Sequence, residues 1–210
     1  YLHTMKGMNI YGASISMPMK NLIIKHLDKI DKCSQITQSV NTVINKNGLL
    51  CGYNSDYIGF QKTVEKLNLH NVAIYGSGSV VDSIVNVLLL KNKVKNIDIY
   101  ARNKKRCKKL NLKYKLGKKD KSNKYDLFIN ATPLDLNRTI KSLVIKSDCV
   151  FDVKVSIKNT ELINFAKSKS VKNISGFQMY KYQLQKQLQF YTGLKLNEKS
   201  LSKLINNSLN

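Results

Sequence analysis

Apolar runs of strand length alternate with amphipathic segments of helix length along most of the chain, most clearly at residues 71–103. Residues 72–75 form an apolar run typical of a buried strand, and residues 96–100 form a second one. Between them, residues 80–90 place four apolar side chains on one helical face: Val81, Ile84, Val85 and Leu88. This stretch predicts a strand–helix–strand unit.

The same alternation continues towards the C-terminus. Further strands are expected at residues 125–129, 150–155 and 171–174, and a final helix at residues 178–191. Thr160 is placed to cap a helix over residues 161–168. Strands that alternate with helices indicate a parallel sheet. The fold class predicted is therefore α/β, with a Rossmann-type doubly wound parallel sheet.

The N-terminal third predicts a second, smaller α/β domain. Residues 14–16 are typical of a strand end, with Ser16 as the cap of a helix that contains Pro18 and runs to residue 27. A strand at residues 39–44, a hairpin turn and a returning strand then lead to a helix over residues 57–67. We expect a substrate domain of residues 1–69 and 177–210, a Rossmann domain of residues 70–176, and the site in the cleft between them.

A glycine turn joins the first Rossmann strand to its helix. Gly76-Ser77-Gly78-Ser79 would let the backbone approach a pyrophosphate at the helix N-terminus. Basic residues follow the second strand, where a unit specific for NAD would carry an acid; they are Arg102, Lys105 and Arg106. Because such residues suit a 2′-phosphate, the sequence predicts NADP. Val81 and Asp82 depart from the usual fingerprint of this turn.

Composition excludes several classes of protein. The net charge is +23, but only Arg102, Arg106 and Arg138 among the 36 basic residues are arginines, and the lysines are scattered, so we expect no nucleic-acid binding. No apolar run reaches the roughly 18 residues of a membrane span. The four cysteines form no CxxC pair and the three histidines lie near no acidic or thiol cluster. We therefore expect a cytoplasmic protein with free thiols and no metal site.

Ordered motifs run along nearly the whole chain. They are Ser14-Ile-Ser-Met-Pro-Met-Lys20, Ser39-Val-Asn-Thr42, Gly52-Tyr-Asn-Ser-Asp56-Tyr-Ile-Gly-Phe60, Gly76-Ser-Gly78, Ala101-Arg102-Asn103, Asn130-Ala-Thr-Pro133, Ser175-Gly176, Gln183 and Tyr191-Thr-Gly193. In order and spacing these motifs resemble the shikimate dehydrogenase family, and the Ser-Met-Pro form of the first motif resembles its shikimate dehydrogenase-like branch. The family's first strand and helix, with a serine pair for the substrate carboxylate, would precede Tyr1. Asp135 and Val155 also depart from the family's pattern.

The resemblance implies NADP-dependent interconversion of shikimate, or a close relative, and 3-dehydroshikimate by hydride transfer, in chorismate and aromatic amino-acid biosynthesis. Such chemistry needs a proton-transfer group within hydrogen-bond reach of the reacting oxygen. Lys20 and Asp56 are the catalytic candidates. An adjacent carboxylate opposes the neutral form that a lysine base requires, so Lys20 as a base and Lys20 as an electrostatic positioning group both stay open.

The remaining site residues follow from the same resemblance. Substrate binding is assigned to Ser14, Ser16, Asn41 and Gln183, and the last three would bind hydroxyls. Cofactor contacts are assigned to Gly76, Ser77, Gly78, Ser79, Arg102, Asn103, Lys105, Arg106, Asn130, Thr132 and Gly176. A small-molecule substrate is thus the expected partner, and a homodimer stays open as the assembly. Three alternatives also stay open: a quinate dehydrogenase, a degenerate dinucleotide-binding relative with little or no activity, and, because of the net charge, a basic nucleic-acid binder.

Overall fold

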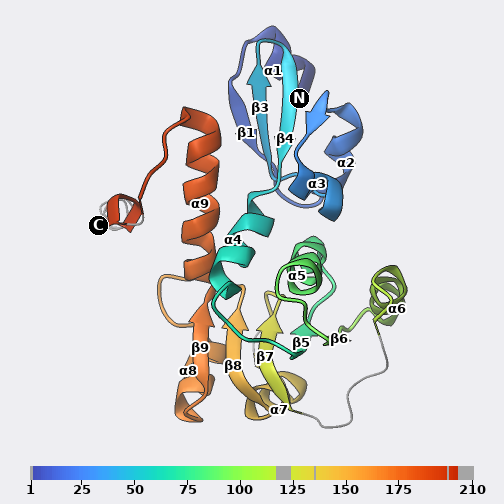
Figure 1. Cartoon of the computed structure of the whole chain (residues 1–210), viewed down its shortest axis with the longest axis vertical. Helices are drawn as coiled ribbons and strands as arrows, with labels where there is room; N and C mark the ends of the chain where they lie inside the picture. The colour runs from blue at the N-terminus through green and yellow to red at the C-terminus, as the bar shows by residue number, and fades with distance from the viewer. Residues whose placement is uncertain (1, 117–123, 135, 198, 203–210) are drawn as a thin grey trace. The chain divides into compact units, whose positions relative to one another are not determined.

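The computed structural model describes residues 2–116, 124–134, 136–197 and 199–202. It divides the chain into two compact units, one formed by Tyr1–Lys62 with Lys181–Asn210 and the other by Thr63–Tyr180. The borders of these units fall inside two helices, α4 (Ser55–Val64) and α9 (Gly176–Thr192). The domain bounds at residues 69/70 and 176/177 stay a prediction. Figure 1 shows the course of the chain by colour.

The first unit contains a four-stranded sheet in the order β1-β3-β4-β2. Its strands are β1 (Gly12–Ser14), β2 (Lys29–Ile30), β3 (Thr42–Lys46) and β4 (Leu49–Tyr53). β3 runs antiparallel to both β1 and β4, and β2 runs parallel to β4. The β3–β4 hairpin turns at Asn47 and Gly48, which both have positive φ, as a two-residue hairpin turn of type I′ requires.

Short helices complete this unit: α1 (Leu2–Gly7), α2 (Met19–Leu22), the 3₁₀ helix η1 (Ile23–His26) and α3 (Lys32–Thr37). The expected cap at Ser16 is wrong. Helix α2 begins only at Met19, with Pro18 at the N-cap position and no side-chain capping bond. A capping side chain must stand directly before the first helical residue; Ser16 instead accepts a backbone hydrogen bond from Met19 N through its carbonyl oxygen, at 3.0 Å.

The second unit contains a five-stranded, fully parallel sheet in the order β6-β5-β7-β8-β9, which confirms the predicted Rossmann-type class. Its strands are β5 (Asn71–Tyr75), β6 (Asn96–Tyr100), β7 (Tyr125–Asn130), β8 (Ser147–Asp152) and β9 (Lys172–Ser175). Its helices are α5 (Ser79–Leu90), α6 (Lys104–Lys113), α7 (Arg138–Ile145) and α8 (Glu161–Ser168).

Packing in this unit follows the apolar pattern of the sequence. The four predicted core residues of α5 are fully buried: Val81, Ile84, Val85 and Leu88. Helices α7 and α8 pack on the sheet face that carries Ala73, Phe128 and Val150. Thr160 caps α8 as predicted, because its side chain accepts a hydrogen bond from Ile163 N. Strand β8 ends at Asp152, earlier than expected, so Val155 lies outside it and is 54% exposed.

Two glycines fit close backbone contacts in the second unit. Gly76 has φ of +144°, and a Cβ added to it would lie 2.7 Å from the carbonyl oxygen of Ala131. A Cβ on Gly176 would lie 2.5 Å from the carbonyl oxygen of Val153. Larger residues would therefore clash with the backbone at both places.

Candidate active site

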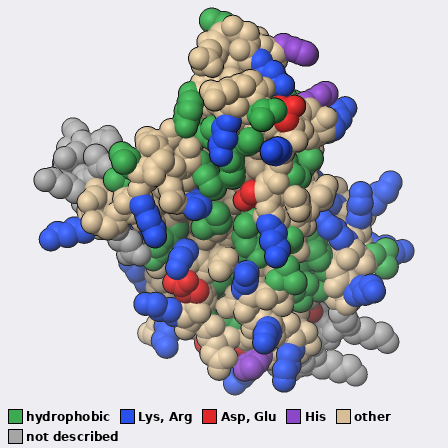
Figure 2. Space-filling view, turned by 45° about the horizontal axis from the view of Figure 1, so that its top comes forward, with side chains coloured by type: hydrophobic (Ala, Val, Ile, Leu, Met, Phe, Trp, Pro, Cys, Tyr) green, Lys and Arg blue, Asp and Glu red, His purple; other side chains and the backbone are tan. Residues whose placement is uncertain are grey.

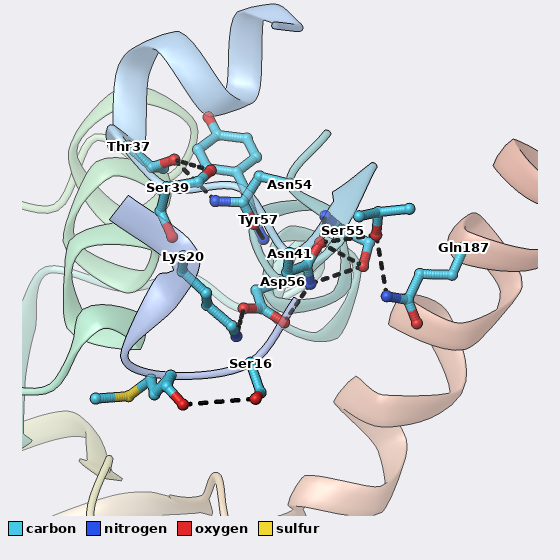
Figure 3. Close-up of polar contacts among 12 residues, drawn as sticks. Ser16, Lys20, Thr37, Ser39, Asn41, Asn54, Ser55, Asp56, Tyr57 and Gln187 are labelled. Atoms are coloured by element: carbon cyan, nitrogen blue, oxygen red, sulfur yellow. Dashed lines mark hydrogen bonds and ion pairs between the residues drawn. The ribbon is translucent and has the colours of Figure 1, made fainter. Parts of the chain in front are cut away.

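A part-buried ion pair joins Lys20, in α2, to Asp56, in the first turn of α4. Lys20 Nζ donates a hydrogen bond to Asp56 Oδ2 at 2.7 Å, and the two side chains are only 17% and 8% exposed (Figure 3). A lysine is rarely withdrawn from water in this way without a specific partner. Lys20 is therefore not one of the solvated lysines that dominate this surface.

Local hydrogen bonds place Asp56 at this point. Asn54 Oδ1 accepts a hydrogen bond from Tyr57 N at 3.1 Å, which caps the start of α4, and Asn54 Nδ2 donates to Thr37 Oγ1 at 2.8 Å. The cap fixes Asp56 in the first helical turn, where the helix dipole favours a carboxylate. The motif at residues 52–60 thus forms the end of a strand followed by a capped helix.

Asn41 orients the carboxylate of Asp56 from the other side. It is 2% exposed, and its Nδ2 donates to Asp56 Oδ1 at 2.8 Å and to Ser55 Oγ at 3.0 Å. Its Oδ1 accepts from Ser55 N at 2.9 Å and from Thr42 Oγ1 at 3.0 Å. Both amide hydrogens of Asn41 are thus already engaged within the protein. Direct contact between Asn41 and a substrate hydroxyl stays a prediction.

The other predicted substrate residues lie in the same unit without a direct hydrogen bond to the Lys20–Asp56 pair. Ser14 Oγ lies 2.8 Å from Tyr191 OH, Ser16 is exposed, and Gln183 is half-buried on α9. Ser14 and Ser16 line a cavity of about 640 Å³ together with Leu2, His3, Lys6, Ile15, Met19, Ile23, His26 and Leu50. Neither Lys20 nor Asp56 lines that cavity.

Sequence reasoning missed Gln187, which lies one helical turn beyond Gln183. Its side chain is 9% exposed, and its Nε2 donates to Thr42 Oγ1 at 3.0 Å. The available signal was the spacing of four residues, which places Gln187 on the same face of α9 as Gln183.

The glycine turn of the second unit presents a helix N-terminus. Gly78 is the N-cap residue of α5, and its position carries no side-chain cap. Ser79, the first residue of α5, is 7% exposed, and Ser77 before the cap is half-buried. The first backbone N–H groups of a helix capped in this way are available to a phosphate.

Asp82 has partners that the sequence did not reveal. Its Oδ1 accepts hydrogen bonds from Lys113 Nζ at 2.5 Å and from Tyr114 OH at 2.6 Å, and its side chain is 13% exposed. Burial, reinforced by the hydrogen bond to Asp82, raises the pKa of Tyr114 and keeps this phenol protonated as a donor. The negative charge of Asp82 is therefore partly compensated by Lys113.

The basic segment after β6 is exposed and begins α6. Arg102, Lys105 and Arg106 are all exposed, and Asn103 caps α6 by accepting a hydrogen bond from Arg106 N at 2.9 Å. A groove of about 480 Å³ at the ends of β5 and β6 is lined by Tyr75, Ile99, Tyr100, Ala101, Arg102, Lys104, Cys107, Lys108, Asn111 and Thr139. The cations on this groove are therefore Arg102, Lys104 and Lys108, and the last two were not predicted. Their spacing of four residues on α6 was the available signal.

Asn130, at the end of β7, holds the loop that contains Thr132. Asn130 Oδ1 accepts from Thr132 Oγ1 at 2.8 Å, and Asn130 Nδ2 donates to Asp152 Oδ1 at 3.1 Å. Asp152, which sequence reasoning missed, is 1% exposed and also accepts from Thr160 Oγ1 at 2.6 Å. Burial raises the pKa of Asp152, although these hydrogen bonds oppose the shift. Asp135, the departure noted in the same loop, lies outside the described residues.

Lysine and arginine side chains are scattered over the visible face of the protein in Figure 2. Cys33, Cys51, Cys107 and Cys149 form no disulfide. Within the described ranges, no group of three or more His, Cys, Asp or Glu residues is arranged to hold a metal ion. In the same part of the chain, no helix combines the length and apolar character that crossing a membrane requires.

The parallel sheet with its glycine turn, and the smaller unit with its part-buried Lys20–Asp56 pair, define a Rossmann-type α/β protein with an additional α/β unit. No protein-family model matches the chain. It is 30% identical to the shikimate dehydrogenase (NADP(+)) of Streptococcus gordonii over 219 residues, which cover 92% of this chain and 76% of that protein. It is also 30% identical to the shikimate dehydrogenase-like protein of Haemophilus influenzae, with 90% and 76% covered. The chain therefore belongs to the shikimate dehydrogenase family.

Solved structures agree with this assignment. A crystal structure of a shikimate dehydrogenase in complex with NADP+ superimposes with a TM-score of 0.83 at 27% identity, over 100% of this chain and 80% of that one.

Proposed function

We propose that the protein is an NADP-dependent oxidoreductase that interconverts shikimate, or a close relative, and 3-dehydroshikimate by hydride transfer. The part-buried Lys20–Asp56 ion pair is the observation that carries this proposal, because it supplies a positioned proton-transfer group. The Streptococcus gordonii relative is a shikimate dehydrogenase (NADP(+)), and a solved relative binds NADP+. In this reading the first unit binds the substrate and the second binds the cofactor.

The residues of the second unit fit a dinucleotide. Gly76 lets the turn pack closely against the backbone of Ala131, where a side chain would clash, and α5 offers its N-terminal N–H groups beside this turn. Arg102, Lys104 and Lys108 line the groove at the end of β6, where a 2′-phosphate would meet positive charge. NADP+ would supply the hydride acceptor for oxidation of the substrate. These contacts support NADP over NAD.

Lys20 and Asp56 would manage the proton that accompanies the hydride. One hydrogen of the Lys20 ammonium is directed to Asp56, which leaves two for a substrate oxygen. In the reductive direction, the ammonium donates a proton to the ketone oxygen as it becomes a hydroxyl. Asp56, held by Asn41, keeps Lys20 in place and compensates its charge. We also place the protein in the cytoplasm, since no disulfide joins its four cysteines.

An absorbance assay for NADPH formation tests the proposal, with shikimate or quinate as substrate and NADP or NAD as cofactor. We expect turnover with shikimate and NADP. Lys20→Ala should lower kcat by about 10²–10⁴-fold, the usual contribution of a positioned proton-transfer group. Lys25→Ala, an exposed lysine in the neighbouring η1, is the matched control and should stay within about twofold.

The outcomes separate the alternatives. Faster turnover of quinate would identify a quinate dehydrogenase. NADP binding without turnover of either compound would identify a degenerate relative. Normal kcat in Lys20→Ala would remove this lysine from the mechanism.

A further inference from the structure

Helix α9 carries one glutamine side chain that is buried against the sheet of the first unit. Gln187 is 9% exposed and donates from Nε2 to Thr42 Oγ1 at 3.0 Å, while Thr42 itself is 0% exposed. Buried amides are costly unless their hydrogen bonds are made. Gln187 and Thr42 thus form a specific polar contact within an otherwise protected interior.

This contact is the first link of a continuous chain of hydrogen bonds. The Thr42 hydroxyl lies 3.0 Å from Asn41 Oδ1, and Asn41 Nδ2 donates to Asp56 Oδ1 at 2.8 Å. Asp56 Oδ2 then accepts from Lys20 Nζ at 2.7 Å. Figure 3 shows Gln187 on α9, Asn41 just before β3, and the paired side chains of Asp56 and Lys20. The chain leads from Gln187 to Lys20 without a gap.

The direction of each hydrogen bond follows from the chemistry of the groups. A threonine hydroxyl has one hydrogen, and Gln187 Nε2 can only donate. The Thr42 oxygen therefore accepts from Gln187, and its single hydrogen is free to point to Asn41 Oδ1. Donation to the carbonyl end of an amide strengthens its N–H groups as donors. Gln187 thereby strengthens the hydrogen bond that Asn41 donates to Asp56.

Gln187 does not decide which way the Asn41 amide faces, because Ser55 N already donates to Asn41 Oδ1 at 2.9 Å. Its effect is confined to the orientation of the Thr42 hydroxyl. Without Gln187, this hydroxyl loses its donor partner and can rotate away from Asn41.

Other contacts hold α9 on the first unit. The rings of Tyr53 and Phe190 stack with centroids 4.1 Å apart, and the Tyr191 ring occupies the space left by the missing side chain of Gly12. The Tyr191 hydroxyl also lies 2.8 Å from Ser14 Oγ. Because these contacts remain when Gln187 is changed, loss of one buried hydrogen bond should not detach the helix.

From this arrangement we infer that Gln187, acting through Thr42 and Asn41, is a positioning residue for the Lys20–Asp56 pair. The inference rests on the proposed oxidoreductase function, and the contact itself exists independently of it. Gln187 touches neither Lys20 nor Asp56, so its influence is transmitted entirely through two buried side chains.

Three variants test the inference: Gln187→Met, Thr42→Val and the double variant. Gln178→Met, an exposed glutamine on the same helix, is the matched control. Each single change should lower kcat about 3–10-fold, as expected for one neutral hydrogen bond in a network, with KM for the cofactor within about twofold. The double variant should be no slower than either single one, because the two residues act in series.

A spectroscopic readout makes the test independent of turnover. The ¹³C carboxyl NMR resonance of Asp56, assigned with Asp56→Asn, should move in Gln187→Met and Thr42→Val but not in Gln178→Met. If it moves while wild-type protein turns over neither shikimate nor quinate, the proposed function fails and the network stands. A resonance that stays in place overturns the inference, as do rate losses that multiply in the double variant or an active Gln187→Met with unchanged kcat.

Discussion

Replacing Asp82 by Asn should change protein stability and cofactor binding in opposite directions. Asp82 Oδ1 accepts from the buried Tyr114 hydroxyl at 2.6 Å and from Lys113 Nζ at 2.5 Å. It also lies in the first turn of α5, the helix that follows the glycine turn. The same carboxylate thus stabilises the free protein and lies near the expected pyrophosphate.

Three interactions set the size of the stability loss. A hydrogen bond from a phenol to a carboxylate contributes about 1.5–3 kcal/mol, and an amide acceptor keeps roughly half of it. Lys113 is 42% exposed, so solvent screening limits its ion pair to about 0–1 kcal/mol. The helix dipole adds about 0.3–1 kcal/mol. Asp82→Asn should therefore lower the free energy of unfolding by roughly 1–3.5 kcal/mol, measured by urea denaturation followed by circular dichroism.

Cofactor affinity should rise in the same variant. A carboxylate and a phosphate about 4 Å apart in water repel by ~1 kcal/mol, and Lys113 already compensates part of the charge of Asp82. The gain in NADP affinity should therefore be below about fivefold and should shrink at high salt. NADPH fluorescence, titrated at low and high salt, measures it.

The matched change is Lys113→Met, which leaves the carboxylate and removes its cation. NADP affinity should then fall, while the free energy of unfolding drops by no more than about 1 kcal/mol. Weaker NADP binding in Asp82→Asn would show that the carboxylate does not face the phosphates. Unchanged stability in that variant would refute the value assigned to the Tyr114 hydrogen bond.

Three further predictions concern single groups. Arg102→Ala should weaken NADP by about 1.5–3 kcal/mol and leave NAD nearly unchanged, which calorimetry can measure; equal losses would contradict a 2′-phosphate contact. Asp56→Ala should lower kcat about as much as Lys20→Ala, and kcat of the double variant should be little lower than that of either single variant. If the two losses in kcat multiply in the double variant, the residues have separate roles. Burial raises the pKa of the Asp152 carboxyl, so the folded protein binds the carboxyl proton more tightly than the unfolded chain does. Proton binding by Asp152 therefore stabilises the fold at low pH, and this stabilisation is lost as pH rises above the ordinary pKa of 3.8. Urea denaturation at several pH values should therefore show the free energy of unfolding of Asp152→Asn rising relative to that of the wild type as pH rises. A difference between the two proteins that does not change with pH would contradict the burial effect.

Local patterns made most of the second unit predictable from sequence. β5, α5 and β6 follow one another with short connections, and the apolar face of α5 can be read directly from its spacing. Strand β2, by contrast, has two residues and exists because Lys29 and Ile30 pair with Cys51 and Gly52. Nothing within so short a segment signals a strand, since its hydrogen-bond partner lies elsewhere in the chain.

In the candidate site, too, residues in local motifs could be predicted from the sequence, and contacts between distant residues could not. The motifs singled out Lys20, Asn41 and Asp56, and their contacts are seen in the structure. Gln187 lies 145 residues from its partner Thr42, and the pairing depends on how α9 meets the sheet. Its spacing of four residues from Gln183 places it on the same helix face but does not identify Thr42 as its partner. Long-range side-chain partners therefore had to come from the structure.

The first unit is built from two segments that are far apart in the sequence, and this affects the order of folding during synthesis on the ribosome. Residues 63–180, which carry every strand of the parallel sheet, are translated before residues 181–192 of α9 appear. The Rossmann-type unit can therefore fold while the earlier unit still lacks the helix that supplies Gln187, Phe190 and Tyr191. Nascent chains arrested before residue 181 should accordingly protect the parallel sheet from proteolysis and leave the β1–β4 sheet open to it.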